Sequence, residues 1–213
     1  MDRPAKFWDK IAEGYAKQPV ADEAAYQKKL QITREYLQPE MEVLEFGCGT
    51  GSTAIAHAPY VKHIRAIDIS AKMLEIARSK ANAVNVANIT FERSTIEEFN
   101  VAEQSLDAVL GLSILHLLAN KEEVIAKVFR MLKPGGLFVS STVCLGDSML
   151  RFLAFIVPIG KRLGLLPLVK AVTRKELEHS LTDAGFEIDY QWQSDKGKAV
   201  FIVARKASLA QSD

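Results

Sequence analysis

The sequence has few cysteines and no excess of charge of either sign. Two of its 213 residues are cysteine, Cys48 and Cys144, too few for a disulfide framework or a cysteine-based metal site. Cys48 lies within a run of glycines where pairing would be harmful, so we expect a reducing, cytoplasmic location. The 27 basic and 26 acidic residues are interspersed and leave a net charge of +1. The chain therefore lacks the basic field of a nucleic-acid-binding protein.

Long apolar runs and clusters of metal ligands are also missing. A membrane span needs about 20 consecutive apolar residues, and the oiliest stretch, 147–172, is interrupted by proline, glycine and basic residues. No apolar stretch follows Met1–Pro4, so no signal peptide is expected. Histidine, cysteine and carboxylate residues show no metal-ligand spacing, and no Gly-x-Ser-x-Gly nucleophile motif occurs. With 48% hydrophobic and 25% charged residues, we predict one globular domain over residues 1–206, followed by a disordered tail at 207–213.

The most informative feature that is present is a strand followed by a run of alternate glycines. The apolar strand 43–46 contains Glu45 near its end, and Gly47, Gly49 and Gly51 follow at once. A helix is expected to begin near residue 52. Because glycine has no Cβ, the backbone can turn sharply and let a ligand approach closely, and the new helix offers free N–H groups there. This pattern is typical of the cofactor crevice in a doubly wound α/β sheet.

The spacing of the glycines argues against two common cofactors. In the dinucleotide pattern Gly-x-Gly-x-x-Gly, the third glycine would fall on Ser52 if counted from Gly47, or on Ala54 if counted from Gly49. The match is weak, although the second variant tolerates alanine. The run also lacks the lysine of a phosphate-binding P-loop. Glu45 would repel a phosphate but suits a cationic group such as an ammonium.

A second acid ends the next predicted strand. The segment His63–Asp68 is apolar and closes with a carboxylate, which can accept hydrogen bonds from both hydroxyls of a ribose. Ser70 is a candidate N-cap for a helix over 71–81. The alternative interpretation, that Asp68 is only a turn residue, is weakened by the glycine run one strand earlier.

Strands and helices alternate along the chain, which predicts an α/β fold. We expect a Rossmann-like, doubly wound, mostly parallel seven-stranded sheet with helices on both faces and a C-terminal antiparallel hairpin. Helices are expected at 7–17, 23–37, 71–81, 122–132 and 173–184. Strands are expected at 43–46, 64–68, 89–92, 107–112, 136–142, 186–193 and 198–205.

These motifs together resemble a known family. The pattern Glu45-x-Gly47-x-Gly49-x-Gly51 followed by Asp68, with the later turn Lys133-Pro134-Gly135-Gly136, resembles a class I S-adenosylmethionine-dependent methyltransferase. The likeness covers most of the chain. It is strongest to the branch that acts on small molecules, which includes quinone-precursor and phospholipid methyltransferases.

The resemblance implies a set of cofactor-binding residues. Gly47 and Gly49 would let the methionine part of S-adenosylmethionine lie on the loop, and Glu45 would hold its amino group through water or a backbone N–H. Asp68 would accept the ribose hydroxyls. The full set is Glu45, Gly47, Cys48, Gly49, Asp68, Ile69, Thr95, Ile96 and Leu112.

The adenine end of that set departs from the family pattern. Ile69 would pack on the adenine, and Ile96 would offer its backbone N–H to the adenine edge. The family commonly has an aspartate where this chain has Thr95, and a hydroxyl can still bond the exocyclic amine. Thr95 is also a plausible N-cap for a short helix over 96–99, helped by Glu98; the two roles are compatible.

Two candidate catalytic residues follow from the same resemblance. His116 comes after the fourth strand, next to the expected methyl position, and a histidine can act as a base near neutral pH. Tyr15 lies on an N-terminal aromatic helix that, with the rest of 1–38, would form a lid over the cofactor. For Tyr15 the alternative is simple packing with Trp8, and for His116 it is a loop residue without a role. His57, His63 and His179 are interpreted as structural.

The acceptor and the partners stay open at this point. The segment 147–172 could cap the substrate site, contact lipid peripherally or form a dimer contact, so the chain could be a monomer or a homodimer. The expected reaction is methyl transfer from S-adenosylmethionine to a small, apolar or amphipathic acceptor, leaving S-adenosylhomocysteine. Two other functions remain: a non-catalytic S-adenosylmethionine-binding module, and an NAD(P)-dependent oxidoreductase, against which Ser52 and Glu45 argue.

Overall fold

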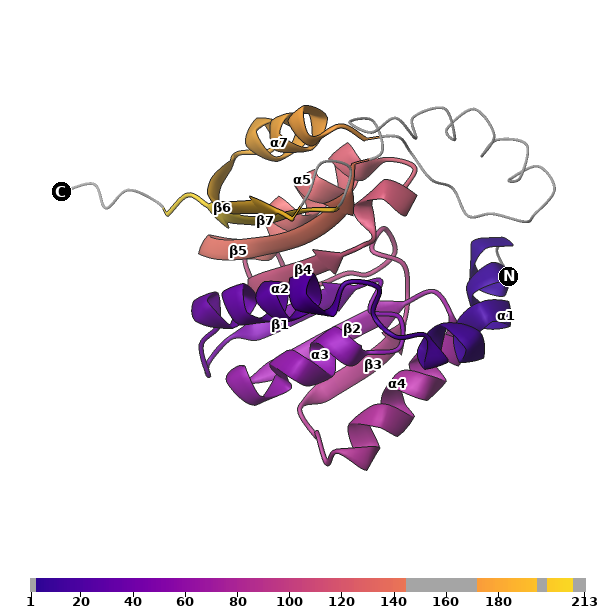
Figure 1. Cartoon of the computed structure of the whole chain (residues 1–213). Helices are drawn as coiled ribbons and strands as arrows, with labels where there is room; N and C mark the ends of the chain where they lie inside the picture. The colour runs from indigo at the N-terminus through magenta and orange to yellow at the C-terminus, as the bar shows by residue number, and fades with distance from the viewer. Residues whose placement is uncertain (1–2, 145–171, 195–198, 209–213) are drawn as a thin grey trace. The chain divides into compact units, whose positions relative to one another are not determined.

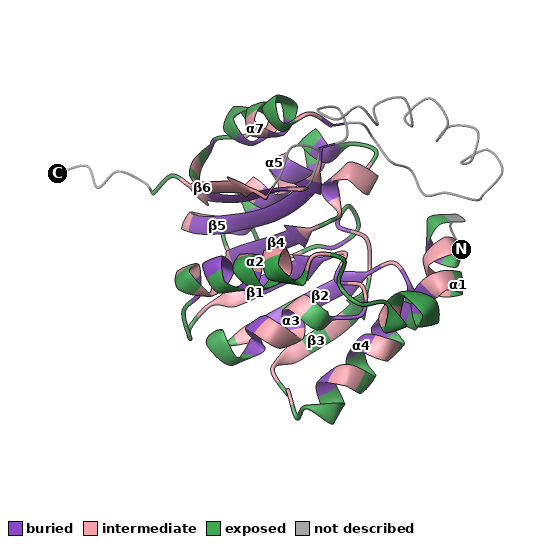
Figure 2. Ribbon diagram, in the orientation of Figure 1, coloured by how far each residue is buried: buried purple, intermediate pink, exposed green. Residues whose placement is uncertain are grey.

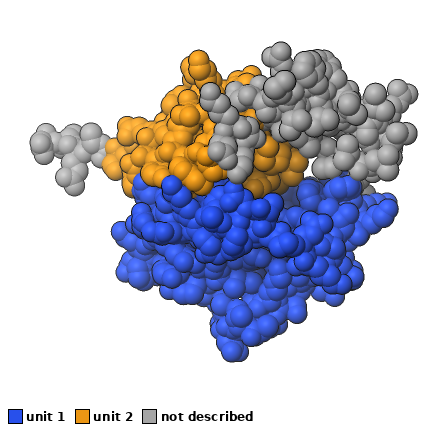
Figure 3. Space-filling view, in the orientation of Figure 1, with its two compact units in different colours: residues 1–99, 159–167 blue, residues 100–158, 168–213 orange. Residues whose placement is uncertain are grey.

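The computed structural model describes residues 3–144, 172–194 and 199–208. It contains two compact units, which Figure 3 shows in different colours. The described part of the first unit is residues 3–99. The described part of the second is 100–144, 172–194 and 199–208.

The described part of the first unit contains three parallel strands, four α-helices and one short 3-10 helix. Its elements, labelled in Figure 1, are α1 (Arg3–Lys17), α2 (Glu23–Tyr36), β1 (Glu42–Phe46), α3 (Ser52–His57), η1 (Ala58–Tyr60), β2 (His63–Asp68), α4 (Ala71–Ala83) and β3 (Ile89–Arg93). The register pairs Phe46 with Ile67, and Asp68 with Arg93. Because the strands are parallel, the loops that follow them meet at one edge of the sheet, as expected for a ligand crevice.

The second unit ends in the predicted antiparallel hairpin. Its elements are β4 (Leu106–Leu112), η2 (Leu115–Leu117), α5 (Lys121–Met131), β5 (Leu132–Val143), α7 (Arg174–Asp183), β6 (Phe186–Gln193) and β7 (Ala199–Lys206). Strand β5 is parallel to β4 and antiparallel to β7, which is antiparallel to β6. The seven strands follow the order β3-β2-β1-β4-β5-β7-β6. The Rossmann-like, mostly parallel sheet predicted from the sequence is confirmed.

Burial explains why these segments form strands. In Figure 2, β4 and β5 are mostly coloured as buried, and β1 has only its first residue partly exposed. Strands that are apolar on both faces are typical of parallel sheets covered on both sides. The largest fully buried side chains include Phe46, Leu44, Ile64 and Ile67 in the first unit, and Phe138, Phe201, Leu110 and Leu132 in the second.

Three predicted elements differ from the sequence-based expectations by more than two residues. Helix α1 begins at Arg3 and not at residue 7, because Pro4 falls in the first turn, where its missing N–H is not needed. Strand β5 begins at Leu132 and not at 136: Leu106 pairs with Leu132 and Ala108 with Leu137, so the Lys-Pro-Gly-Gly turn is a bulge inside the strand.

The third difference concerns the segment after β3. Residues 96–98 form a turn and not the predicted helix. The expected cap is nevertheless present, because the Glu98 N–H donates to Thr95 Oγ1 over 3.1 Å. One capped turn satisfies the local backbone without further helix.

Three predicted features fall wholly or largely outside the described residues. These are the segment 147–172, of which only Val172 is described, the hairpin turn expected at 194–197, of which only Ser194 is described, and most of the tail. Within the described parts of the chain, no helix combines the length and the apolar character needed to cross a bilayer.

Candidate functional site

The loop after β1 depends on glycine at three positions. Gly47, Gly49 and Gly51 have φ of 66°, 53° and 74°, in the left-handed region that disfavours other residues. A Cβ on Gly51 would lie 2.8 Å from the Ala77 Cβ and 3.1 Å from the Phe91 ring, so the absent side chain lets the loop pack on α4 and β3. A Cβ on Gly49 would meet no atom within 4 Å in the described chain. The loop is therefore packed on one side and open at Gly49.

Asp68 at the end of β2 holds this loop in place. Its Oδ2 accepts a hydrogen bond from the Gly49 N–H at 2.9 Å, and its Oδ1 accepts one from the Ser70 N–H at 2.8 Å. Burial raises the pKa of Asp68, and these hydrogen bonds partly offset the rise. Each carboxylate oxygen retains capacity for a further hydrogen bond. Asp68 thus braces the loop and can still accept bonds from a ligand.

Glu45 is a buried carboxyl group with an unsatisfied atom. Only 3% of its surface is exposed, and Oε2 has no hydrogen-bond partner in the described structure. Burial, followed by the nearby charge of Asp68, raises the pKa of Glu45 to about 8. A buried polar atom without a partner is costly. A positively charged ligand group at this position would supply the partner and favour the ionised carboxylate.

Cys48 contributes to the loop through its backbone. Its N–H donates to Ile67 O at 3.1 Å, which ties the loop to β2. The thiol is buried, and burial raises its pKa well above the ordinary value. Cys48 is therefore held as a neutral thiol, which is unreactive.

The segment after β3 lies against the residues that follow β2. The Ser94 N–H donates to Asp68 O at 3.2 Å, and Arg93 Nε donates to Ile69 O at 3.0 Å. Ile96 is buried, and Thr95 uses one lone pair of its hydroxyl in the turn described above. The structure thus brings the predicted methionine, ribose and adenine positions together at one edge of the first unit.

An acidic residue of α1, Asp9, also lies at this edge, and the sequence analysis did not predict it. Asp9 Oδ1 accepts hydrogen bonds from Ser70 Oγ at 2.6 Å and from the Lys72 N–H at 3.1 Å. Ser70 is the predicted N-cap of α4, since its Oγ accepts from the Met73 N–H at 3.1 Å. No spacing rule reveals Asp9, because the bond joins residues 61 positions apart.

The aromatic stripe of α1 is present as predicted. The rings of Phe7 and Trp8 lie 5.3 Å apart, and those of Trp8 and Tyr15 lie 6.4 Å apart, both edge to face. Tyr15 is 49% exposed. Its packing with Trp8 therefore leaves much of the ring available to another molecule.

Leu112 and His116 belong to the second unit. Leu112 ends β4 and His116 lies in η2. His116 Nδ1 is buried without a partner in the described structure, and burial lowers the pKa of the ring. His116 is therefore neutral near pH 7 and able to accept a proton. Its membership of the same site as the glycine loop stays a prediction.

Two of the remaining histidines, His57 and His63, have structural surroundings, whereas His179 is exposed on α7. His57 is fully buried in α3, and burial together with Arg34 lowers its pKa to about 4. His63 Nε2 lies 2.9 Å from Thr90 Oγ1 on the neighbouring strand. Among the residues that the structure describes, no group of histidine, cysteine and carboxylate side chains could hold a metal ion.

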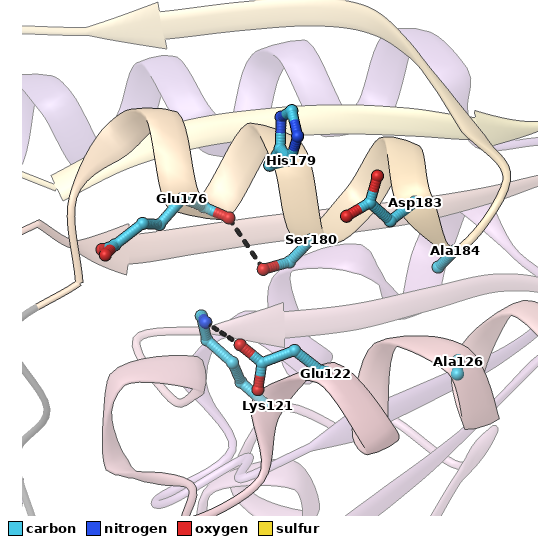
Figure 4. A pocket seen from close by; sticks show the side chains of 8 residues that line it. All are labelled: Lys121, Glu122, Ala126, Glu176, His179, Ser180, Asp183 and Ala184. Atoms are coloured by element: carbon cyan, nitrogen blue, oxygen red, sulfur yellow. Dashed lines mark hydrogen bonds and ion pairs between the residues drawn. The ribbon is translucent and has the colours of Figure 1, made fainter.

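A pocket in the second unit offers a weaker site. It lies between α5 and α7, has a volume of about 460 Å³ and is open to solvent (Figure 4). Lys121 is paired with Glu122, and Ser180 Oγ donates to Glu176 O at 2.7 Å. Ligand pockets are usually enclosed, whereas this one is open. Its lining residues are Lys121, Glu122, Ala126, Glu176, His179, Ser180, Asp183 and Ala184.

Comparison with known proteins finds methyltransferases, and the matched region includes both units. A family model described as a methyltransferase domain matches residues 37–201. An uncharacterized methyltransferase of Bacillus subtilis is 31% identical over 110 residues, 52% of this chain and 44% of that protein. A ubiquinone biosynthesis O-methyltransferase of Rickettsia akari is 27% identical, with 74% of this chain and 64% of that protein covered. A demethylmenaquinone methyltransferase of Tropheryma whipplei is 35% identical, with 53% and 45% covered. The chain thus spans about half to two thirds of the length of these relatives.

Solved structures of low sequence identity share the fold. The Bacillus subtilis protein has a TM-score of 0.70 at 19% identity, with 86% of this chain and 100% of that chain covered. A SAM-dependent methyltransferase from Methanosarcina mazei has a TM-score of 0.70 at 24% identity, with 84% and 98% covered. Since the domain model matches most of the sequence, the chain belongs to the methyltransferase domain family.

Proposed function

We propose that this protein transfers a methyl group from S-adenosylmethionine to a small, apolar or amphipathic acceptor. The observation that carries the proposal is the buried Glu45 carboxyl, whose Oε2 lacks a partner, two residues before a glycine loop that Asp68 braces. The chemistry supplied by bound S-adenosylmethionine is an activated methyl group on a sulfonium. Enzymes that use it need mainly to hold the acceptor atom in line with that methyl group.

The residues of the first unit fit this cofactor by charge and shape. Glu45 would stabilise the ammonium group of the methionine part, and the open face at Gly49 would let that part lie against the backbone. The remaining hydrogen-bonding capacity of Asp68 would serve the ribose. Near the adenine we assign Ile69, Thr95 and Ile96. Gly47, Cys48 and, from the second unit, Leu112 complete the proposed set.

Proton handling is assigned to His116. Because burial lowers its pKa, the ring is neutral near pH 7 and can take a proton from a hydroxyl or amine acceptor. Tyr15, with half of its surface exposed on α1, is proposed to contact the acceptor or the carboxylate of the cofactor. The base is not needed if the acceptor atom is already deprotonated.

An oily acceptor is favoured by two independent observations. Two of the similar proteins are named for ubiquinone biosynthesis and for demethylmenaquinone, and such quinones are largely apolar. The segment 147–172 of this chain is rich in leucine, isoleucine and phenylalanine. We propose that this segment serves the acceptor, as a cap over it or as a lipid contact.

Binding of S-adenosylhomocysteine to the full chain tests the cofactor assignment. Isothermal titration should give a dissociation constant in the micromolar range or below, and Glu45→Gln should weaken it. Asp189→Asn, which removes a surface carboxylate from β6, is the matched control. Absence of heat and of a thermal shift in the unaltered chain would refute the assignment.

Turnover separates catalysis from binding alone. The chain would be incubated with S-adenosylmethionine carrying a deuterated methyl group and a panel of prenylated quinols, phenols and fatty acyl esters. A product heavier by the labelled methyl group supports the enzyme. Cofactor binding without product from any acceptor would favour a non-catalytic binding module, and binding of NADH in its place would favour an oxidoreductase.

A further inference from the structure

We infer that Asp9 is a positioning residue, which couples the docking of helix α1 to the glycine loop through Ser70 and Asp68. The inference rests on the proposed function only for the identity of the ligand. It assigns the N-terminal helix a defined mechanical link to the cofactor edge.

The link begins with a charged acceptor on α1. The hydrogen bond from Ser70 holds the pKa of Asp9 below its usual value, so the carboxylate is ionised at neutral pH. Its Oδ1 accepts both the Ser70 hydroxyl at 2.6 Å and the Lys72 N–H at 3.1 Å. Hydrogen bonds to an ionised acceptor are shorter and stronger than neutral ones. Asp9 therefore fastens α1 to the first turn of α4.

Ser70 carries the link into the sheet edge. It is fully buried, and its hydroxyl donates to Asp9 while accepting from the Met73 N–H. Its own N–H donates to Asp68 Oδ1 at 2.8 Å. With both groups engaged, Ser70 has one arrangement that satisfies all its partners, so a displacement of Asp9 disturbs Asp68.

Asp68 completes the connection. Its second oxygen accepts the Gly49 N–H, so Asp9, Ser70, Asp68 and Gly49 form one continuous chain of hydrogen bonds. Helix α1 also packs along α4 (Figure 1). A ligand that orders Gly49 and Asp68 would hold Ser70 in place for Asp9. By thermodynamic reciprocity, docked α1 strengthens ligand binding as much as the ligand strengthens docking.

The chain contains its own reporter of this coupling. Trp8 precedes Asp9 on α1, and the other tryptophan of the protein, Trp192, lies in β6. In a Trp192→Phe background, the fluorescence of Trp8 reports α1 alone. A matched control is also available on the same helix, because Glu13 is an exposed acid.

The experiment compares Asp9→Ala with Glu13→Ala in the full-length Trp192→Phe chain. We expect Asp9→Ala to weaken S-adenosylhomocysteine binding about tenfold by calorimetry and to abolish the Trp8 fluorescence change on binding. Glu13→Ala should alter neither. Asp9→Asn, which keeps an acceptor oxygen without the charge, should restore part of the affinity. In a Ser70→Ala background, Asp9→Ala should cost less than threefold, because the link is already broken.

The possible failures are distinguishable. If Asp9→Ala folds, binds with unchanged affinity and keeps its Trp8 response, the coupling is overturned while the proposed function stands. If Asp9→Ala does not fold, the comparison rests on Asp9→Asn, for which an unchanged affinity and Trp8 response again overturn the coupling. If the unaltered chain does not bind S-adenosylhomocysteine, the proposed function falls together with this inference.

Discussion

The Gly49 N–H donates a hydrogen bond to Asp68 Oδ2 across 2.9 Å, so the carboxylate that ends β2 fixes the loop that follows β1. The bond joins two residues that the sequence marks independently, one by its lack of a side chain and one by its charge. It ties the end of β2 to the loop that follows β1. The first prediction tests this relationship.

Replacement of Asp68 by alanine should weaken S-adenosylhomocysteine binding by about 1.5–3 kcal/mol, since hydrogen bonds to a charged group are lost. The lost affinity has two sources: the hydrogen bonds from Asp68 to the ligand, and the bond from Gly49 that holds the loop in place. Calorimetry measures it, and Asp189→Ala on the surface of the second unit should show no change. Unchanged affinity in folded Asp68→Ala would contradict the ribose assignment.

Because the pKa of Glu45 is raised, we expect folding stability to fall as the solution becomes alkaline. Its folded-state pKa of about 8 exceeds the value of 4.5 for an unburied glutamate. The folded protein therefore holds an extra proton between these values, and the associated stability is complete below about pH 4.5 and lost as the pH rises through 8. Urea unfolding should show a loss of about 2 kcal/mol between pH 6 and 8. In Glu45→Gln most of this loss should disappear.

Ligand binding should release the same proton. A cationic group beside Glu45 would lower its pKa, so S-adenosylhomocysteine should bind more tightly as the pH rises from 6 to 8. Titrations in two buffers of different ionisation enthalpy measure the proton release directly. A release of zero at pH 7 would mean that Glu45 does not meet the charged group.

Because of the buried His57, we expect folding stability to fall as the solution becomes acidic. Its folded-state pKa of about 4 lies below the value of 6.5 for an unburied histidine. The unfolded chain then binds more protons in this range, so stability is complete above about pH 6.5 and lost as the pH falls toward 4. In His57→Phe, the dependence of folding stability on pH between 6.5 and 4 should be smaller by as much as about 1.4 kcal/mol per pH unit. His179→Phe on the surface of α7 should leave this dependence unchanged.

Two glycines should respond in opposite directions to the same substitution. Gly51→Ala forces a left-handed residue with a Cβ 2.8 Å from Ala77, and we expect a destabilisation of about 1–3 kcal/mol. Gly14→Ala lies inside helix α1 with no atom near the new Cβ in the described structure, and should stabilise by about 0.5–1 kcal/mol. Thermal unfolding of the two variants measures both effects. Equal effects would mean that the loop tolerates rearrangement at Gly51.

The features predicted correctly from the sequence are those with local causes. The glycine loop, the cap at Ser70 and the strand alternation each arise from residues near one another in the chain. The antiparallel hairpin was also predicted, from two neighbouring strand patterns, whereas the order of the seven strands in the sheet was not predicted. Of the candidate site, the segments that follow β1, β2 and β3 are joined by hydrogen bonds, as the parallel register predicts.

The features that escaped prediction depend on distant partners. The Asp9–Ser70 bond and the bulge opposite Asp107 exist only because other segments supply the matching groups. Lys133, for example, reaches Asp107 at 2.7 Å from within the bulge. The sequence likewise indicated an acid at Glu45 but not that burial would keep it protonated.

The reactivity of Cys48 can report how often the glycine loop opens. A thiol that is both buried and protonated does not react with iodoacetamide until the surrounding backbone opens. The rate of alkylation at this residue, separated from Cys144 by peptide mass spectrometry, therefore measures how often the glycine loop leaves its closed arrangement. A ligand that binds the loop should lower the rate of Cys48 alkylation in proportion to its occupancy. The measurement needs no label attached to the protein beforehand.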